Sequence, residues 1–130
     1  MKKGFTLLEI IVVIIIIGVL ATLGFTQYTK VIEKGRTAEA KTILGQLRGA
    51  QIVYYQEHGE YTTTLNSLYV GSLPVTGACA TRFYFGYECA DTGSCTATRC
   101  TAAGKEPQGP DAYVINLSVA GVFSGSAGYF

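Results

Sequence analysis

Four cysteines carry the most reactive side chains of this chain, and all lie in its second half: Cys79, Cys89, Cys95 and Cys100. Such thiols can form disulfides or bind zinc. An even number of cysteines in an exported chain favours two disulfides, for which three connectivities are possible. Zinc is less favoured because no C-x-x-C pair is present and the only histidine, His58, lies well before them. We predict two disulfides, without determining which cysteines pair, and no metal site.

The other polar residues do not form a set that could catalyse a reaction. A single histidine and scattered carboxylates do not supply a nucleophile, a base and a group that orients it. Gly121, Gly125 and Gly128 are too loosely placed for a phosphate-binding loop. Asp91 and Asp111 could hold calcium, but no calcium-loop motif is present and aspartates in loops are usually turn formers. We expect no enzymatic activity and no cofactor.

Glu9 is the only charged side chain in an apolar segment, residues 5–29. Residues 10–17 are all Ile or Val. A carboxylate in the middle of a membrane costs about 2.5–3.5 kcal/mol on insertion scales. A simple membrane anchor or a secretory signal peptide gains nothing from such a residue, so Glu9 indicates a partner outside the segment.

The element that positions Glu9 is predicted to be a membrane-spanning helix. Ile10–Thr29 has no charged residue, and a helix of about 20 residues spans about 30 Å, the thickness of the hydrocarbon core. β-Branched residues favour strands in water, but in lipid the backbone must satisfy its own hydrogen bonds, which favours a helix. Lys2 and Lys3 would stay in the cytoplasm, so the rest of the chain would lie outside.

The composition fits one small domain attached to this segment. The chain has 130 residues, of which 48% are hydrophobic and 15% charged, and its mean hydropathy is +0.29. The length allows one domain, and the hydropathy excludes a disordered chain. A net charge of +1 gives no indication of a nucleic-acid partner.

The N-terminal motif resembles a known family. Residues 3–9, KGFTLLE, run directly into the Ile/Val tract and closely resemble the leader of type IV pilins and of type II secretion pseudopilins. The resemblance continues through Gly18 and Gln27-Tyr28, and Tyr54-Tyr55 and residues 59–61 are similar to the region after the long helix in these proteins. It covers about the first half of the chain.

The resemblance implies roles for three residues. Residues 1–4 would be a leader that a membrane prepilin peptidase removes after Gly4, and Phe5 would become the N-methylated N-terminus. Glu9 would pair with the α-amine of a neighbouring subunit, and a buried carboxylate is tolerable when it is paired with an ammonium group. The partners implied are other copies of the chain in a helical filament, the peptidase and methyltransferase, an inner-membrane assembly platform, and lipid before assembly.

One position departs from the family pattern. Many members have a proline one residue before the Gln-Tyr pair, and this chain has Thr26 there. Proline would kink or break the helix, so we expect a straighter free subunit. The departure puts in doubt whether the stretch between Gly18 and Thr26 melts on assembly.

The helix is predicted to continue to His58 and to end at Gly59, a plausible C-terminal cap. One helical face combines the residues Ala40, Ile43, Leu47, Ala50 and Tyr54. The polar residues Glu33, Arg36, Lys41, Arg48 and Gln51 are expected mostly on other faces. We expect the apolar face to pack on the chain's own sheet, although a coiled-coil seam between subunits is an alternative.

Residues 60–130 are predicted to form a small antiparallel β head. Residues 62–69 indicate a loop with a short helical turn, and strands are predicted at Arg82–Cys89, at Ala112–Val119 and from Val122 onward. Residues 77–104 are expected to be loop-rich and stapled by the disulfides. The chain thus divides into leader 1–4, apolar helix 5–29, amphipathic helix 30–59 and head 60–130, an α+β pilin-like fold.

Three functions remain open at this point. The first is a structural subunit of a type IV pilus-like filament for adhesion, motility or surface attachment, which starts as an inner-membrane precursor and ends on the cell surface. The second is a pseudopilin of a type II secretion system. The third is a membrane-anchored periplasmic binding domain that does not polymerise.

Overall fold

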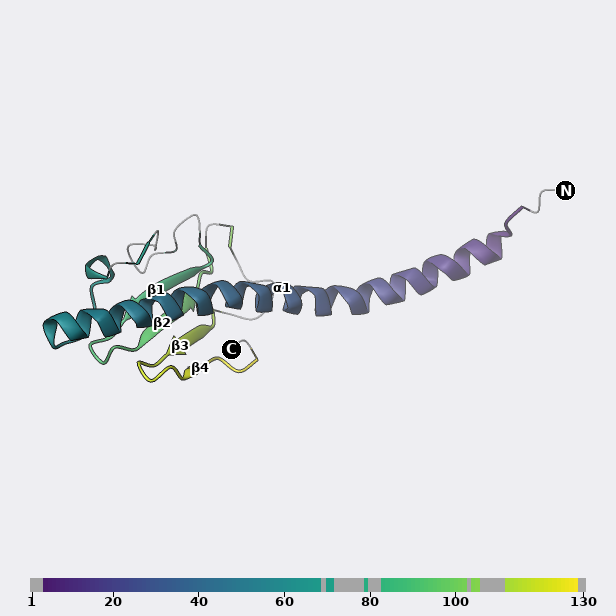
Figure 1. Cartoon of the computed structure of the whole chain (residues 1–130). Coiled ribbons are helices and arrows are strands. Elements are labelled where there is room, and N and C mark those ends of the chain that lie inside the picture. Colours follow the sequence, from purple (N-terminus) through teal and green to yellow (C-terminus); the bar gives the residue numbers. More distant parts are fainter. Residues whose placement is uncertain are drawn as a thin grey trace.

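The computed structural model describes residues 4–68, 70–71, 79, 83–102, 104–105 and 112–128, without the side chain of Thr26. It contains α1 (Leu7–His58), the 3-10 turn η1 (Leu65–Ser67), β1 (Phe85–Cys89), β2 (Cys95–Arg99), β3 (Val114–Leu117) and β4 (Phe123–Gly125). One long helix lies on a four-stranded sheet (Figure 1). This confirms the predicted α+β, pilin-like fold.

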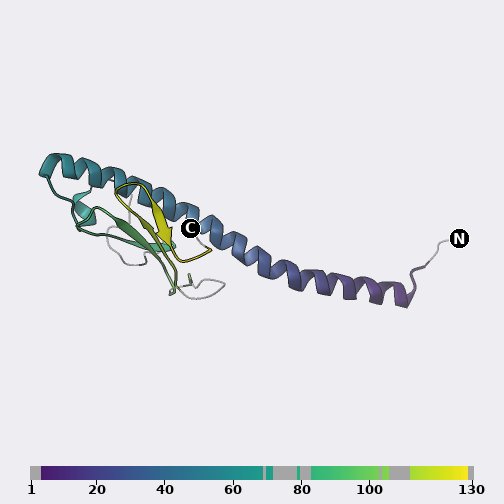
Figure 2. The same cartoon turned by 90° about the horizontal axis from the view of Figure 1, so that it is seen from below.

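The helix α1 is a single element of 52 residues, about 78 Å long. It begins at Thr6, whose side chain accepts a hydrogen bond from the backbone N–H of Glu9, and ends at Gly59, whose φ of 78° lies in the left-handed region. The Gly59 N–H donates to the carbonyl of Tyr55. The helix curves gently and has no break near Gly18 or Gly24 (Figures 1 and 2), as expected where proline is absent.

The sheet is an antiparallel meander in the order β1-β2-β3-β4. The strands predicted at Arg82–Cys89 and Ala112–Val119 are present but shorter, and Arg82 lies outside the described residues. Residues 77–104 were expected to be loop-rich, with a strand only at Arg82–Cys89. The strand β2 in this range was not predicted, and it pairs with both β1 and β3. Its sequence, CTATR, lacks the large aliphatic residues that mark a strand, so only pairing on both edges reveals it.

The core forms where one face of α1 meets β1, β2 and β3. The predicted face is confirmed, since Ala40, Ile43 and Leu47 are buried and Ala50 and Tyr54 are partly buried against the same cluster. The sheet contributes Phe85, Tyr87, Ala97, Ile115 and Leu117. The placement of Glu33 and Gln51 away from this face was wrong, because both are buried. They extend the helical stripe at its two ends, where each has a specific polar partner.

The loop after α1 agrees with the prediction of a short helical turn, and Leu68 is buried against the core. The turn predicted at Ala120-Gly121 is also present, with Gly121 at a φ of 88°. Among the described residues, α1 is the only helix long and apolar enough to cross a membrane. The sheet covers its C-terminal half and leaves its N-terminal half free, as Figure 2 shows.

Candidate functional site

The N-terminal half of α1 presents apolar side chains in all directions. We call residues 5–29 the apolar arm. Its large apolar side chains expose between 43% (Ile11) and 80% (Phe5) of their surface, and the most apolar stretch of the helix is not buried at any position. An apolar surface of this kind requires lipid or other protein around it. The arm is therefore an interaction surface rather than part of the chain's own core.

Glu9 lies in the first turn of α1, at the tip of the apolar arm. Its backbone N–H donates to the Thr6 hydroxyl over 3.2 Å. Within the described part of the chain, its carboxylate forms no hydrogen bond or ion pair. The N-terminal end of a helix carries a partial positive charge, which favours a carboxylate there. The carboxylate is thus available to a cation of another molecule.

Gly4, Phe5 and Thr6 precede the helix as an exposed, non-helical segment. An extended and exposed segment can enter the active site of a peptidase, so the predicted cleavage position after Gly4 is accessible. The remainder of the predicted leader, residues 1–3, lies outside the described residues.

A buried charged cluster, which no sequence pattern predicted, joins α1 to the sheet. The Arg99 guanidinium, at the end of β2, donates to both carboxylate oxygens of Glu33 over 3.1 Å. The Tyr113 hydroxyl donates to Glu33 over 2.9 Å, and Arg36 forms an ion pair with the same carboxylate. Arg99 also donates to the carbonyl of Cys100 over 2.7 Å. The cluster fixes the sheet to α1 where the apolar arm ends.

The electrostatics of this cluster favour the ionised form of Glu33. Burial alone would raise the pKa of the Glu33 carboxyl, but hydrogen bonds from Arg99 and Tyr113 and the charges of Arg99 and Arg36 outweigh it, so the pKa is lowered. Burial and the neighbouring Glu33 raise the pKa of the Tyr113 hydroxyl. Tyr113 therefore stays protonated and donates to a carboxylate that stays charged. A paired arrangement of this kind is structural and has no free base for catalysis.

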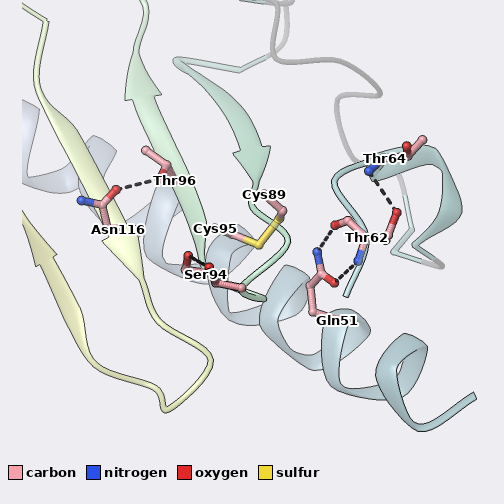
Figure 3. The surroundings of a disulfide bond; sticks show 9 residues. Gln51, Thr62, Thr64, Cys89, Ser94, Cys95, Thr96 and Asn116 are labelled. Atoms are coloured by element: carbon pink, nitrogen blue, oxygen red, sulfur yellow. Dashed lines mark hydrogen bonds between the residues drawn. A yellow bond between two sulfur atoms is a disulfide. The ribbon is translucent and has the colours of Figure 1, made fainter. Parts of the chain in front are cut away.

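The structure assigns the two disulfides whose pairing the sequence left open. Cys89 and Cys95 face each other at the ends of β1 and β2 and form one bond, with Cα atoms 4.1 Å apart (Figure 3). Cys79 and Cys100 form the other, with Cα atoms 5.6 Å apart. No cluster of His, Cys, Asp or Glu able to hold a metal ion occurs among the described residues. Asp111, one of the two aspartates considered for calcium, lies outside the described part of the chain.

The far end of α1 is fixed to the head by Gln51 and Tyr61. The Gln51 amide donates to the carbonyl of Thr62 and accepts the N–H of the same residue, so this buried side chain has its polar atoms satisfied (Figure 3). The ring of Tyr61 stacks on Tyr55 and lies directly against Gly93 in the β1–β2 turn. The loop after the helix is therefore fixed to both helix and sheet.

Comparison with known proteins identifies the N-terminal region. Residues 1–25 match the family model of the prokaryotic N-terminal methylation motif. The chain is 34% identical to a fimbrial protein, EcpC, of Eikenella corrodens over 86 residues, 59% of this chain and 56% of that protein. It is 35% identical to the type IV major pilin protein PilA of Myxococcus xanthus over 76 residues, 58% of this chain and 34% of that protein.

A third relative is the type IV major pilin protein PilE1 of Neisseria gonorrhoeae, 32% identical over 74 residues, 57% of this chain and 45% of that protein. The matches thus span between a third and just over half of these relatives' length. All three are named as structural pilin or fimbrial proteins and not as enzymes. The methylation motif, the similarity to parts of several pilins and the long helix on a small sheet all support a type IV pilin family for this chain.

Proposed function

We propose that this protein is the structural subunit of a type IV pilus-like filament. The observation that carries the proposal is the apolar arm, whose large side chains are 43–80% exposed along the helix. Before assembly the arm is surrounded by lipid, and after extraction from the membrane it is surrounded by the arms of other copies. Identical chains related by a head-to-tail operation that does not close form a filament.

In this proposal Glu9 forms an ion pair with a neighbouring subunit, and this pair exists only in the assembled filament. Cleavage after Gly4 frees the amine of Phe5, which becomes N-methylated and remains a cation. A Glu9 carboxylate in a newly added subunit then pairs with the Phe5 amine of its neighbour. Pairing removes most of the penalty for a carboxylate in an apolar environment, so Glu9 favours the assembled state over the lipid-bound monomer.

The same scheme proposes a location and a set of partners. The precursor lies in the inner membrane with its head outside the cytoplasm and meets a prepilin peptidase, a methyltransferase and an assembly platform there. The filament then extends from the cell surface, where it serves adhesion, motility or attachment. Support for the membrane stage comes from the length and apolarity of α1.

The proposal is tested by expressing the full chain in a bacterium that has a pilus assembly system and lacks its own major pilin. We expect mass spectrometry of sheared filaments to find a chain that begins at methyl-Phe5. Glu9→Ala should reduce filament yield while the membrane pool stays intact, and Glu9→Asp, which keeps the charge, should retain more assembly. Wild-type yield from Glu9→Ala would contradict the role of Glu9, and a different N-terminus would contradict the processing scheme.

A pseudopilin of a type II secretion system is the alternative within the family. The names of the matched relatives, which are major pilins and fimbrial proteins, favour the pilus. Deletion of the gene separates the two functions. Loss of surface filaments with normal protein export supports the pilus, whereas loss of export without loss of surface filaments supports the secretion system.

A further inference from the structure

A groove lies along one flank of the C-terminal turns of α1. It encloses about 480 Å³. Its apolar lining comes from α1 and from the segment that follows η1: Ala50, Val53, Tyr54, Leu68 and Val70. Val53 exposes 52% of its surface. Glu57 is the only carboxylate among the described residues that line the groove, and neither lysine nor arginine is among them.

The opposite flank of α1 carries residues 118–123, the β3–β4 turn together with the first residue of β4; we call this segment the β3–β4 turn. Val122 and Phe123 expose 64% and 37% of their surface. Lys41 Nζ lies 5.9 Å from the centroid of the Phe123 ring, and Arg48 Nε donates to the Val119 carbonyl over 2.7 Å. No carboxylate is among the described residues that line this side. Two exposed apolar side chains thus lie beside two cations.

The two surfaces face in opposite directions around the helix. Glu57 follows Arg48 by nine residues, which at about 100° per residue places it about 180° away around the axis. Figure 1 shows the same relation between elements, with η1 and β4 on opposite sides of α1. One flank combines an apolar hollow with a carboxylate, and the other combines exposed apolar side chains with two cations. No single copy can bring them together.

We propose that the β3–β4 turn of a second copy of this chain docks in the groove. Val122 and Phe123 enter the apolar hollow beside Val53, and Lys41 of the incoming copy approaches Glu57. Burial of apolar surface supplies affinity, and the opposite charges set the orientation. The proposal rests on the proposed function, because two different surfaces on opposite flanks give a contact that propagates from copy to copy instead of closing as a symmetric dimer.

The positions of the surfaces along α1 also fix an offset between copies. The α1 residues that line the groove lie between Gln46 and His58. Those that line the opposite surface lie between Lys41 and Arg48. Their midpoints differ by about seven to eight residues, which corresponds to about 11 Å along the axis at 1.5 Å per residue. Neighbouring copies with parallel helices would be displaced by this amount when the contact forms.

Cross-linking within filaments tests the contact directly. All four native cysteines are in disulfides, so Val53→Cys and Val122→Cys introduce the only free thiols. With a short bismaleimide on filaments of the full chain, the double variant should give a ladder of oligomers. Co-assembled single variants should give dimers only, and each single variant alone should give monomers. Filaments of the double variant that stay monomeric after treatment would overturn the proposal, and so would dimers from Val53→Cys alone.

Charge exchange provides a second test with its own rescue. Glu57→Lys should lower filament yield several-fold, and addition of Lys41→Glu in the same chain should restore it. Gly49 offers a steric test, since a Cβ there meets no atom within 4 Å; Gly49→Phe fills the groove and should block assembly, while Gly49→Ala should not. Wild-type yield from Gly49→Phe would overturn the docking mode, whereas absence of filaments from the unmodified chain would instead overturn the proposed function.

Discussion

Arg99 is a charged side chain with 1% of its surface exposed, and its contacts explain how the fold accommodates it. Its guanidinium donates to Glu33 and to the carbonyls of Tyr84 and Cys100, and its carbon Cζ lies 5.1 Å from the centroid of the Tyr84 ring. Removal of one partner of a buried ion pair is far more destabilising than replacement of both, because it leaves one charge uncompensated. Glu33 and Arg99 therefore act as a unit that holds the sheet against the helix.

The lowered pKa of Glu33 predicts a specific loss of stability in acid. Because the folded state holds Glu33 ionised more strongly than the unfolded chain does, the pair stabilises the fold above the unfolded pKa of about 4.3. This contribution is lost as the pH falls through the lower folded pKa. We expect the unfolding free energy of the wild type to decrease more steeply with falling pH in this range than that of Glu33→Gln. The unfolding free energy of each detergent-solubilised chain is measured by denaturant titration at several pH values. An equal dependence of this free energy on pH in the two chains would contradict the prediction.

Two buried tyrosines provide a matched comparison at the same scale. The Tyr113 hydroxyl donates to Glu33, whereas the Tyr87 hydroxyl is buried and has no hydrogen-bond partner among the described residues. Tyr113→Phe should lower the unfolding free energy by about 1 kcal/mol or more, since the bond is to a charged group. Tyr87→Phe should leave it unchanged or raise it, because a buried polar group without a partner is removed. Thermal unfolding of both variants under the same conditions checks the difference in sign.

At the scale of elements, the head is held by contacts at both ends of the helix stripe. Glu33 and Arg99 connect α1 to β2 near the apolar arm, and Gln51 connects α1 to the loop before η1. Tyr61 continues this second connection to the β1–β2 turn through its contact with Gly93. The Cys89–Cys95 disulfide closes the same turn. The sheet is therefore fixed at two levels along the helix, with the apolar core between them.

Gly93 and Gly104 separate the effect of this contact from that of backbone conformation. Both have a left-handed φ, 77° and 76°. Of the two, only a Cβ at Gly93 would meet a neighbour among the described residues, a ring atom of Tyr61 at 2.8 Å. Gly104→Ala should destabilise the fold by about 1–2 kcal/mol, the cost of a left-handed conformation for alanine. Gly93→Ala should destabilise it further, because the Tyr61 ring must move. Equal unfolding free energies of the two variants would show that the Tyr61 contact has no part in stability.

At the scale of the whole molecule, one continuous helix serves two environments. Its C-terminal half is covered by the sheet, while its N-terminal half remains apolar and exposed. No boundary in the backbone separates the halves, because α1 runs unbroken from Leu7 to His58. The division arises from side chains, since the wholly apolar arm gives way to a helix with one buried stripe. The exposed arm therefore accounts for both the lipid-bound stage and the assembly that we propose.

Removal of the apolar arm tests this division. A chain that begins at Lys30 keeps Glu33, the core stripe and both disulfides, and we expect it to be monomeric in buffer without detergent. The full chain should require detergent or lipid under the same conditions. Size-exclusion chromatography with light scattering measures the mass of each. Aggregation of the shortened chain, together with loss of its β-sheet circular dichroism, would show that the head depends on the arm for its fold.

Local sequence patterns were enough to predict the long helix, its cap at Gly59, the apolar arm and the isolated Glu9. These features depend on local periodicity and on composition, which are readable without knowledge of any distant contact. It also predicted two disulfides, because that conclusion needs only the number of cysteines and an exported chain. The strands of β1 and β3 were predicted from their aromatic and aliphatic residues, although both were expected to be longer.

Three features depend on contacts between segments that are distant in sequence: the pairing of the cysteines, the strand β2 and the burial of Glu33 and Gln51. The register of β1 against β2 brings Cys89 face to face with Cys95, and these two form one disulfide. Cys79 and Cys100 then form the other. Glu33 was expected away from the apolar face of the helix, yet Arg99, which follows it by 66 residues, makes its burial favourable. A charged side chain can be buried only when its partner arrives through folding, and that partner cannot be recognised from the neighbouring sequence.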